Sequence, residues 1–285
     1  MEVETFDTLF NCLVFILWFR IWTVGDSSLF FNPHLVPINR ISESLFGFLW
    51  PLFRRTSSRL VAAILALILL ALRGVFIPQS IGWTLKMGFE IQICPAGLPY
   101  HVLFSVLSFA IFLFKLWGFS LIFMRTAYGQ FDHAGDALHR LSLPFSDLKI
   151  ELRPLVLAIF GMLLAFLVNL TGDLARGVDA WSGTPLPSLL LRCFISALAG
   201  WASVLPILST LLVVLIIGSW VSLFSSSQGL SFFCREWLDV LMGPLRNFPV
   251  RIGMLDLTPL IFIFVIQWTY PFIVGLLQSS YDKLL

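Results

Sequence analysis

Charged residues are scarce in this chain. Of its 285 residues, 12% are charged and 58% are hydrophobic, and the mean hydropathy is +0.93. A soluble globular domain has about 25% charged residues, so this composition predicts an integral membrane protein. The net charge is only +2, and the basic residues form no large patch. Direct binding of nucleic acid is therefore not expected.

The sequence also lacks the motifs that mark common metal sites and active sites. Its four cysteines have no CxxC spacing, which argues against a zinc site or a disulfide framework. It contains no nucleophile elbow, P-loop or HExxH motif, and no pair of carboxylates lies where a sheltered pocket is evident. We therefore expect no catalytic residue, no cofactor and no metal ligand, and an enzyme is the least favoured class. A metal site is one weak alternative, although a solvated helix face explains the same residues: Asp132, His133, Asp136 and His139.

Long apolar stretches are abundant instead, together with 29 Phe and 10 Trp, which suit lipid-facing helices. The N-terminus is acidic, unlike a signal or transit peptide, so the first stretch is expected to remain as a span. The predicted fold is an all-α membrane protein with six transmembrane helices, at about 6–24, 59–77, 99–124, 153–170, 187–224 and 259–277. The fifth is nearly twice the length that a bilayer needs and contains Pro206. It is either one kinked helix or two short spans packed end to end.

Amphipathic segments separate these spans. Apolar residues recur at helical spacing in 38–52, more weakly in 138–148, and again in 233–241. Each segment is predicted to be a helix lying on the membrane surface. The order of span, surface helix, basic turn and span occurs three times, which predicts three repeat units: 1–80, a degenerate unit at 81–172, and 173–285. The segment 78–98 is expected to be a loop with an interfacial piece.

Lys and Arg are distributed unequally between the two sides of this predicted bundle. The loops after the first, third and fifth spans hold eleven of them: Arg40, Arg54, Arg55, Arg59, Arg125, Arg140, Lys149, Arg153, Arg235, Arg246 and Arg251. The opposite side holds three: Lys86, Arg176 and Lys283. Since positively charged loops stay in the cytoplasm, the surface helices are predicted to be cytoplasmic. Both termini then lie outside, and the protein is expected in the inner (cytoplasmic) membrane.

One cation, Lys115, lies near the middle of the third span, and Gln267 of the last span and Asn169 of the fourth are polar residues that can face it. An ionisable residue inside a membrane is a functional hypothesis by default. A lysine that snorkels to the interface or bonds backbone carbonyls explains the same observation. No acidic residue is predicted at a similar depth, so a proton-coupled transporter is poorly supported.

The most informative stretch is 237–272, where an amphipathic helix, a basic turn and a span follow one another. A Gly-Pro pair ending at Pro244 stops the surface helix. Asp256 or Thr258 is predicted to cap the next helix, with Pro259 just inside its start. The sequences GPLRNFP and MLDLTPL in this stretch resemble the signature of the YggT family, also called YlmG, of small integral membrane proteins.

The beginning of the chain is similar to the first repeat of the same family, in the sequences FRIW, FNP and WPLFRR. The resemblance covers about half of the chain. Family members usually contain two such units, so the middle unit is an enlargement. The matching positions are Arg20, Trp22, Asn32, Pro33, Pro51 and Arg54 in the first unit, and Trp220, Pro244, Arg246, Asp256, Thr258 and Pro259 in the last. Gly218 stands where the family often has Arg.

The resemblance implies an assembly or membrane-organising factor, because family members are associated with cell division, nucleoid distribution and cytochrome complex assembly. Basic turns beside amphipathic helices predict a cytoplasmic platform that binds lipid headgroups or a protein partner. The residues expected to act there are Arg54, Arg55, Arg246, Arg251 and Trp237. A homo-oligomer is left open. The alternative is a small channel or transporter for ion uptake or osmotic tolerance, which the repeats and Lys115 favour.

Overall fold

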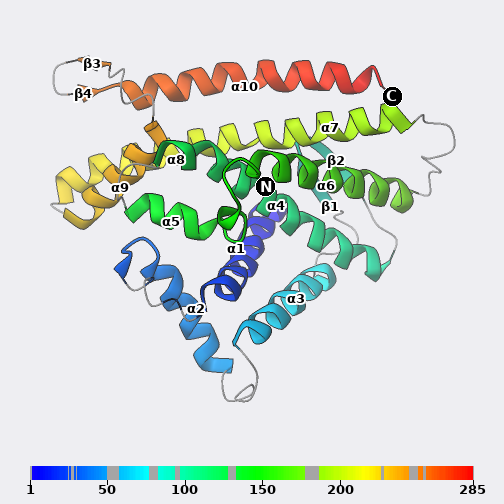
Figure 1. Cartoon of the computed structure of the whole chain (residues 1–285), viewed down its shortest axis with the longest axis horizontal. Helices are drawn as coiled ribbons and strands as arrows, with labels where there is room; N and C mark the ends of the chain where they lie inside the picture. Colours follow the sequence, from blue (N-terminus) through cyan, green and yellow to red (C-terminus); the bar gives the residue numbers. More distant parts are fainter. Residues whose placement is uncertain are drawn as a thin grey trace.

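The computed structural model describes residues 2–24, 26, 29, 31–49, 58–76, 83–93, 97–127, 133–176, 186–225, 228–243, 250–252 and 255–284. Within these residues the chain forms ten α-helices, one short 3₁₀ helix and two small β-hairpins (Figure 1). The predicted helical class is therefore correct for most of the chain, but strands are also present.

Seven of these helices are long and apolar. They are α1 Glu2–Thr23, α3 Ser58–Phe76, α4 Leu98–Ala127, α6 Arg153–Arg176, α7 Leu186–Ala202, α8 Val204–Ser225 and α10 Thr258–Asp282. Five apolar stretches are long enough to cross a membrane: α3, α4, α6, α7 with α8, and α10. The apolar part of α1, Leu9–Thr23, is shorter. The chain is thus compatible with a multi-pass membrane protein, and a sixth span formed by α1 stays a prediction.

Helix α4 lies at the centre of the bundle, and α10 lies at its edge. The apolar window of α4 is 56% buried, compared with 11% for α10. α4 packs against α1, α3, α6, α7 and α8, whereas α10 runs alongside α7 and the beginning of α8 (Figure 1). The outward face of α10 exposes Phe264, Trp268 and Phe272. Such an aromatic face suits contact with lipid.

The long fifth stretch is one apolar run with a break. α7 and α8 follow one another end to end and are interrupted at Ser203, whose N–H still bonds the carbonyl oxygen of Ala199 at 3.0 Å (Figure 1). Pro206 has no N–H to donate to the carbonyl of Ala202, which explains why the helix breaks one turn before it. The stretch Leu186–Ser222 would be about 55 Å long if it were straight, so it exceeds the thickness of the hydrocarbon.

The segment between α3 and α4 corrects one prediction. It was expected to be a loop, but Trp83–Met87 (β1) and Phe89–Ile93 (β2) pair as an antiparallel hairpin. The hairpin packs against α4, α6 and α7, and Leu85 and Met87 are buried in the core. These two residues alternate with polar ones, a period-two pattern that the analysis of the sequence missed.

The tip of this hairpin requires glycine. Gly88 has a φ of +95°, which residues with a side chain rarely adopt. A Cβ atom at this position would also lie 2.5 Å from the backbone of Ala199 in α7. Both effects mean that only glycine lets the hairpin approach α7 so closely.

The start of α10 corrects a second prediction. The N-cap residue is Leu257, and no side chain caps the helix. The hydroxyl of Thr258 instead accepts a hydrogen bond from the N–H of Val250 at 2.9 Å. That bond closes a turn in which Arg251–Ile252 (β3) pairs with Leu255–Asp256 (β4). Pro259 lies in the first turn, as predicted.

Three shorter helices occur where surface helices were predicted, and their place on a membrane surface stays a prediction. They are α2 Val36–Leu49, α5 His133–Leu141 and α9 Gln228–Met242, and a 3₁₀ turn, Phe145–Asp147, follows α5. The middle helix begins five residues earlier than predicted and ends before Pro144. α2 packs on α1, α5 packs on α4 and α9, and α9 runs along α8. All three lie on the same side of the molecule (Figure 1).

Candidate functional site: a joint between the surface helices

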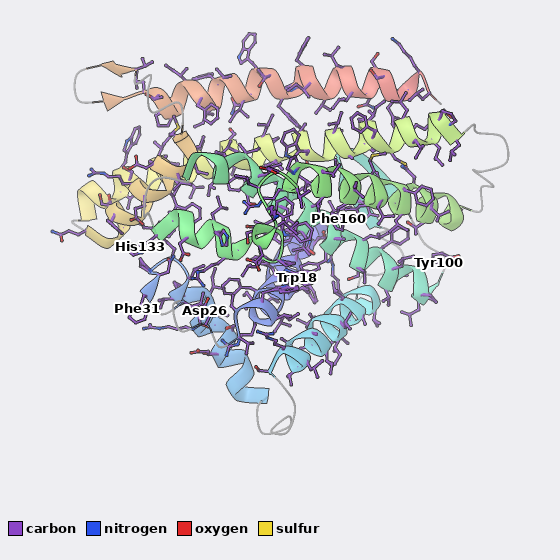
Figure 2. All side chains as sticks on the ribbon, in the orientation of Figure 1. Trp18, Asp26, Phe31, Tyr100, His133 and Phe160 are labelled. Atoms are coloured by element: carbon purple, nitrogen blue, oxygen red, sulfur yellow. The ribbon has the colours of Figure 1, made fainter. Side chains whose placement is uncertain are left out.

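Two residues of the segment between α1 and α2 connect it to the other two surface helices. We call this contact region the joint and define it as Asn32, His34, Asp136, Glu236 and Trp237. Asp136 belongs to α5, and Glu236 and Trp237 belong to α9. Figure 2 shows Phe31 and His133 near one another, where this segment approaches α5. Residues about 100 and 200 positions apart are therefore in direct contact.

Asn32 binds α5 through its side-chain amide. Its Nδ2 group donates to the carbonyl oxygen of His133 at 2.8 Å and to the carboxylate of Asp136 at 2.9 Å. Its Oδ1 atom accepts from the N–H of His34 at 3.0 Å. Asn32 is only 2% exposed, so loss of these bonds would leave polar groups buried without partners.

His34 binds α9 through its ring. Nε2 lies 2.5 Å from the carboxylate of Glu236, and the indole N–H of Trp237 donates to Nδ1 at 3.3 Å. An indole nitrogen can only donate, so Nδ1 must accept and the proton of the neutral ring is on Nε2. Nε2–H therefore donates to Glu236. The ring of Phe233 also packs on His34, with centroids 4.9 Å apart.

Ion pairs extend the joint toward α1. Arg140 of α5 contacts Asp136 at 3.0 Å and also forms an ion pair with Asp26. Burial lowers the pKa of Arg140, but the hydrogen bonds and charges of the two carboxylates outweigh burial and raise this pKa above its ordinary value. On the other side of the segment, Arg20 of α1 donates to the side chain of Asn39 in α2 at 3.1 Å. The ends of α1, α2, α5 and α9 are thus connected by polar contacts.

Apolar side chains form the floor of the joint. Phe19, Leu29, Leu35 and Ala137 are buried together, and Trp237 packs against them. Burial of these side chains is the main favourable term, and the polar contacts above them fix the orientation of the helices.

The joint contains two of the predicted site residues. Asn32 and Trp237 are central to it, and Arg20 is at its edge. Trp22 is exposed and packs edge-on against Trp18, and Pro33 is exposed. Neither Trp22 nor Pro33 has a role in the joint beyond its position in the chain.

Several predicted residues lie outside the described part. Arg54, Arg55, Pro51, Pro244 and Arg246 are among them. The backbones of Arg251 and Asp256 face one another in the β3–β4 hairpin. The role of the basic turns in binding therefore stays a prediction.

One of the candidate metal donors already has other partners. The carboxylate of Asp136 already binds Asn32 and Arg140. Within the described residues, no group of three or more His, Cys, Asp or Glu is placed to hold a metal ion. Asp132 lies outside those residues.

Lys115 and Gln267, two of the predicted intramembrane polar residues, lie on helices that are not among the extensively packed pairs. Lys115 is half-buried near the middle of α4, while Gln267 is exposed on α10, which packs on α7 and α8. The prediction that Gln267 faces Lys115 is therefore not supported by the packing.

A buried charge that the analysis of the sequence missed lies elsewhere in the bundle. Arg73 of α3 is fully buried and forms an ion pair with Asp7 of α1. Its guanidinium also donates to Asn11 at 2.8 Å and to Ser108 of α4 at 2.9 Å. The sequence could have indicated this buried charge, because Arg73 lies inside an apolar stretch, as Lys115 does.

Comparison with protein-family models, curated proteins and solved structures finds no match for this chain. The similarity to the YggT family therefore stays a prediction that rests on the two motifs in the sequence.

Proposed function

We propose that this protein is a non-enzymatic scaffold of the YggT type in the inner membrane, which organises or assembles other membrane components. In this proposal α2, α5 and α9 together form a platform on the cytoplasmic side, and a protein partner binds to it. Cell division, membrane organisation and assembly of a membrane complex are the processes that the family resemblance suggests.

The joint is the observation that carries this proposal. Three amphipathic helices from distant parts of the chain are held together by buried polar contacts of Asn32 and His34. If the helices served only to join spans, independent anchoring in the interface would be enough. A surface that is ordered before binding loses little conformational entropy when a partner binds, which favours association.

The outward side chains of the platform suit a protein surface. On α2, Arg40 and Ile41 are exposed, and on α9 Phe232 and Arg235 are exposed. Arginine and large apolar residues are common at the centres of protein interfaces. We further propose that Arg54, Arg55, Arg246 and Arg251 in the basic turns contact anionic lipid headgroups and hold the platform at the membrane.

A channel or transporter is the second candidate, and two observations favour it. The tip of the β1–β2 hairpin contacts α7 at Ala199, four residues before the break at Ser203. Irregular backbone inside a membrane bundle and broken helices are typical of transport sites. The second observation is the ion pair between the buried Arg73 and Asp7, since charges inside a membrane bundle are often functional. Ion flux into liposomes that contain the purified protein, lost in Arg73→Met, would support this candidate.

The scaffold proposal can be tested by crosslinking in cells. A photoreactive residue replaces Ile41 on α2 or Phe232 on α9, both of which are about half exposed. A third variant has it at Trp268 on the outward face of α10, as a control for contacts made by lipid and random neighbours. We expect the same protein to be captured from both platform positions and not from α10.

The decisive comparison adds a second substitution. Asn32→Leu removes the amide that binds α5, whereas Gln267→Leu changes an exposed polar residue of α10. Capture of the partner from the platform positions should fall in the Asn32→Leu variant and persist in the Gln267→Leu variant. It should also fall when Arg246 and Arg251 are changed to Gln. Equal capture from the Asn32→Leu variant would contradict the proposal that an ordered joint is needed, and capture of phospholipid alone would reject a protein partner.

A further inference from the structure

A groove between α4, α6 and α7 has the dimensions of a hydrocarbon site. Its volume is about 160 Å³, and its lining is apolar. Phe114, Leu157 and Ala197 are buried at its floor, while Phe194 and Trp201 are partly exposed at its rim. An apolar cavity of about 150 Å³ is large enough to bind benzene, so this groove accommodates a section of one acyl chain.

Glycine keeps one rim of the groove close to α4. A Cβ atom at Gly118 would lie 2.6 Å from the indole ring of Trp201. Without it, the indole lies against α4 and its N–H reaches the carbonyl oxygen of Gly118 at 3.4 Å. Tryptophan favours the membrane interface because its ring is apolar and its N–H is polar, so Trp201 suits a groove near the headgroup level.

A polar cavity of about 690 Å³ lies at the start of α6, beside the groove. The residues that line it include the basic Lys149 and Arg153 and the acidic Asp147 and Glu151. The buried hydroxyl of Ser146 in the same lining has no hydrogen-bond partner within the described residues. This cavity therefore combines charges of both signs with an unsatisfied polar group.

The two cavities are parts of one surface. Arg153 lines the polar cavity and Leu157 lines the groove, and residues four apart in a helix lie on the same face. Pro154 directly follows Arg153 and lines the groove as well. Leu148 of the polar cavity packs against the core cluster that contains Phe114 and Leu157. A molecule with a polar head and an apolar chain can occupy both cavities at once.

The side chains around the polar cavity are held in place. The guanidinium of Arg153 donates to the carbonyl oxygens of Leu148 at 3.0 Å and Ser146 at 2.6 Å. Phe145 stacks on Trp117 of α4, with ring centroids 5.5 Å apart.

Burial and the charge of Arg153 lower the pKa of His139, which also lines the cavity, so that His139 is neutral at pH 7. The formal charges of the cavity then balance: two positive and two negative side chains.

We infer that these cavities bind one zwitterionic glycerophospholipid with a primary amine in its head group, because a primary ammonium group can donate hydrogen bonds to the two carboxylates and a quaternary one cannot. Its phosphodiester lies near the exposed Lys149 and close to the buried charge of Arg153, its ammonium group lies near Asp147 and Glu151, and part of one acyl chain fills the groove. An anionic lipid would satisfy the two basic residues but would leave the two carboxylates facing a like charge. The cavity shares His139 of α5 with the platform, but the inference does not rest on the proposed function.

The test uses full-length protein in nanodiscs of phosphatidylcholine. The probe is phosphatidylethanolamine with a diazirine at the middle of one acyl chain, and a matched probe has phosphatidylglycerol as its head group. After illumination, mass spectrometry of peptides locates the label. We expect the phosphatidylethanolamine probe to label peptides that contain Phe194 or Trp201, and the phosphatidylglycerol probe to label them several-fold less.

Two tryptophan variants provide a matched control. Ala158 is exposed and lines the groove, whereas the next residue, Ile159, is exposed and is not among the residues that line it. Ala158→Trp fills the groove and should reduce labelling by about tenfold, since several methylene contacts are lost. Ile159→Trp should leave it unchanged. Equal labelling of the Ala158→Trp variant, or label spread evenly over α10, would show annular lipid only and would overturn the inference.

A second set of variants tests the head group without changing the groove. Asp147→Asn combined with Glu151→Gln should abolish the preference for phosphatidylethanolamine over phosphatidylglycerol, and Lys149→Ala should weaken both probes. All three residues are exposed, so these changes should not prevent folding. If the wild-type protein labels equally with both probes, the argument from charges of both signs is wrong.

Discussion

The ion pair between Arg73 and Asp7 gives the sharpest prediction about stability. The guanidinium of Arg73 is fully buried, whereas the side chain of Asp7 is 26% exposed. The two charges are therefore not equivalent. Asp7→Leu would leave a buried guanidinium without its carboxylate, although Asn11 and Ser108 would still accept hydrogen bonds from it. Arg73→Met would leave a carboxylate that water can still reach.

The expected magnitudes follow from this asymmetry. Removal of one partner of a buried pair costs about 3–5 kcal/mol in the free energy of unfolding. Because an arginine cannot lose its proton, we expect Asp7→Leu to cost about 3 kcal/mol. Arg73→Met should cost about 1–2 kcal/mol, because Asp7 can be hydrated or protonated. The double variant should be no worse than Arg73→Met, since it leaves no unpaired charge.

The measurement is the free energy of unfolding in mixed micelles, obtained by titration with SDS. Leu67→Met is a suitable control, because Leu67 is exposed on the same helix as Arg73. The variant that combines Asp7→Leu with Arg73→Met shows whether the two residues interact. If the costs of the two single changes simply add, the residues do not interact and the reasoning is refuted. Equal costs for the two single changes would refute the argument that exposure makes the charges unequal.

Three further predictions concern the hairpin, the joint and the end of α5. Gly88→Ala should destabilise the protein by about 2 kcal/mol or more, because it adds strain at positive φ and a clash with α7. Gly229→Ala is its control: nothing lies within 4 Å of the added atom, so the same assay should detect no loss of stability. Asn32→Leu should speed amide hydrogen exchange in α5 by about tenfold or more, since a buried side chain loses its bonds to α5; unchanged exchange would mean that apolar packing alone holds α5. The pKa of His139 is lowered in the folded state by burial and by Arg153, so its contribution to stability is complete above about pH 6.5 and is lost as the pH falls below that value. Hydrogen exchange in 139–148, corrected for intrinsic rates, should therefore accelerate on acidification in the wild type and much less in His139→Gln; identical pH profiles would exclude His139 as the cause.

Local patterns in the sequence predicted the helices well. The apolar stretches have bounds within a few residues of α1, α3, α4, α6 and α10, because a span must be long and apolar wherever it packs. The surface helices α2 and α9 were found for a similar reason, since the apolar residues that face a neighbour repeat at helical spacing. The prediction was poorer for α5, where the apolar pattern is weak and a turn follows it.

The β1–β2 hairpin shows where local patterns were not sufficient. Its strands alternate apolar and polar residues over only five positions each, which is too short to stand out among Gly and Pro. Its position against α4, α6 and α7 depends on the space left by Gly88 and on contacts with residues far away in the sequence. Likewise, Leu257 begins α10 without a capping side chain because Thr258 binds Val250 instead.

The sequence by itself thus determined the class of the protein, a mainly helical chain with several helices long and apolar enough to cross a membrane and shorter helices between them. Only the tertiary structure decided which polar residues meet. The sequence alone does not reveal that Asn32 contacts Asp136 of α5 or that His34 contacts Glu236 of α9. It also does not reveal that Arg73 pairs with Asp7 of α1. The physical reason is range: hydrophobic length and period are properties of neighbouring residues, whereas a buried hydrogen bond or ion pair requires two distant segments to fold against one another.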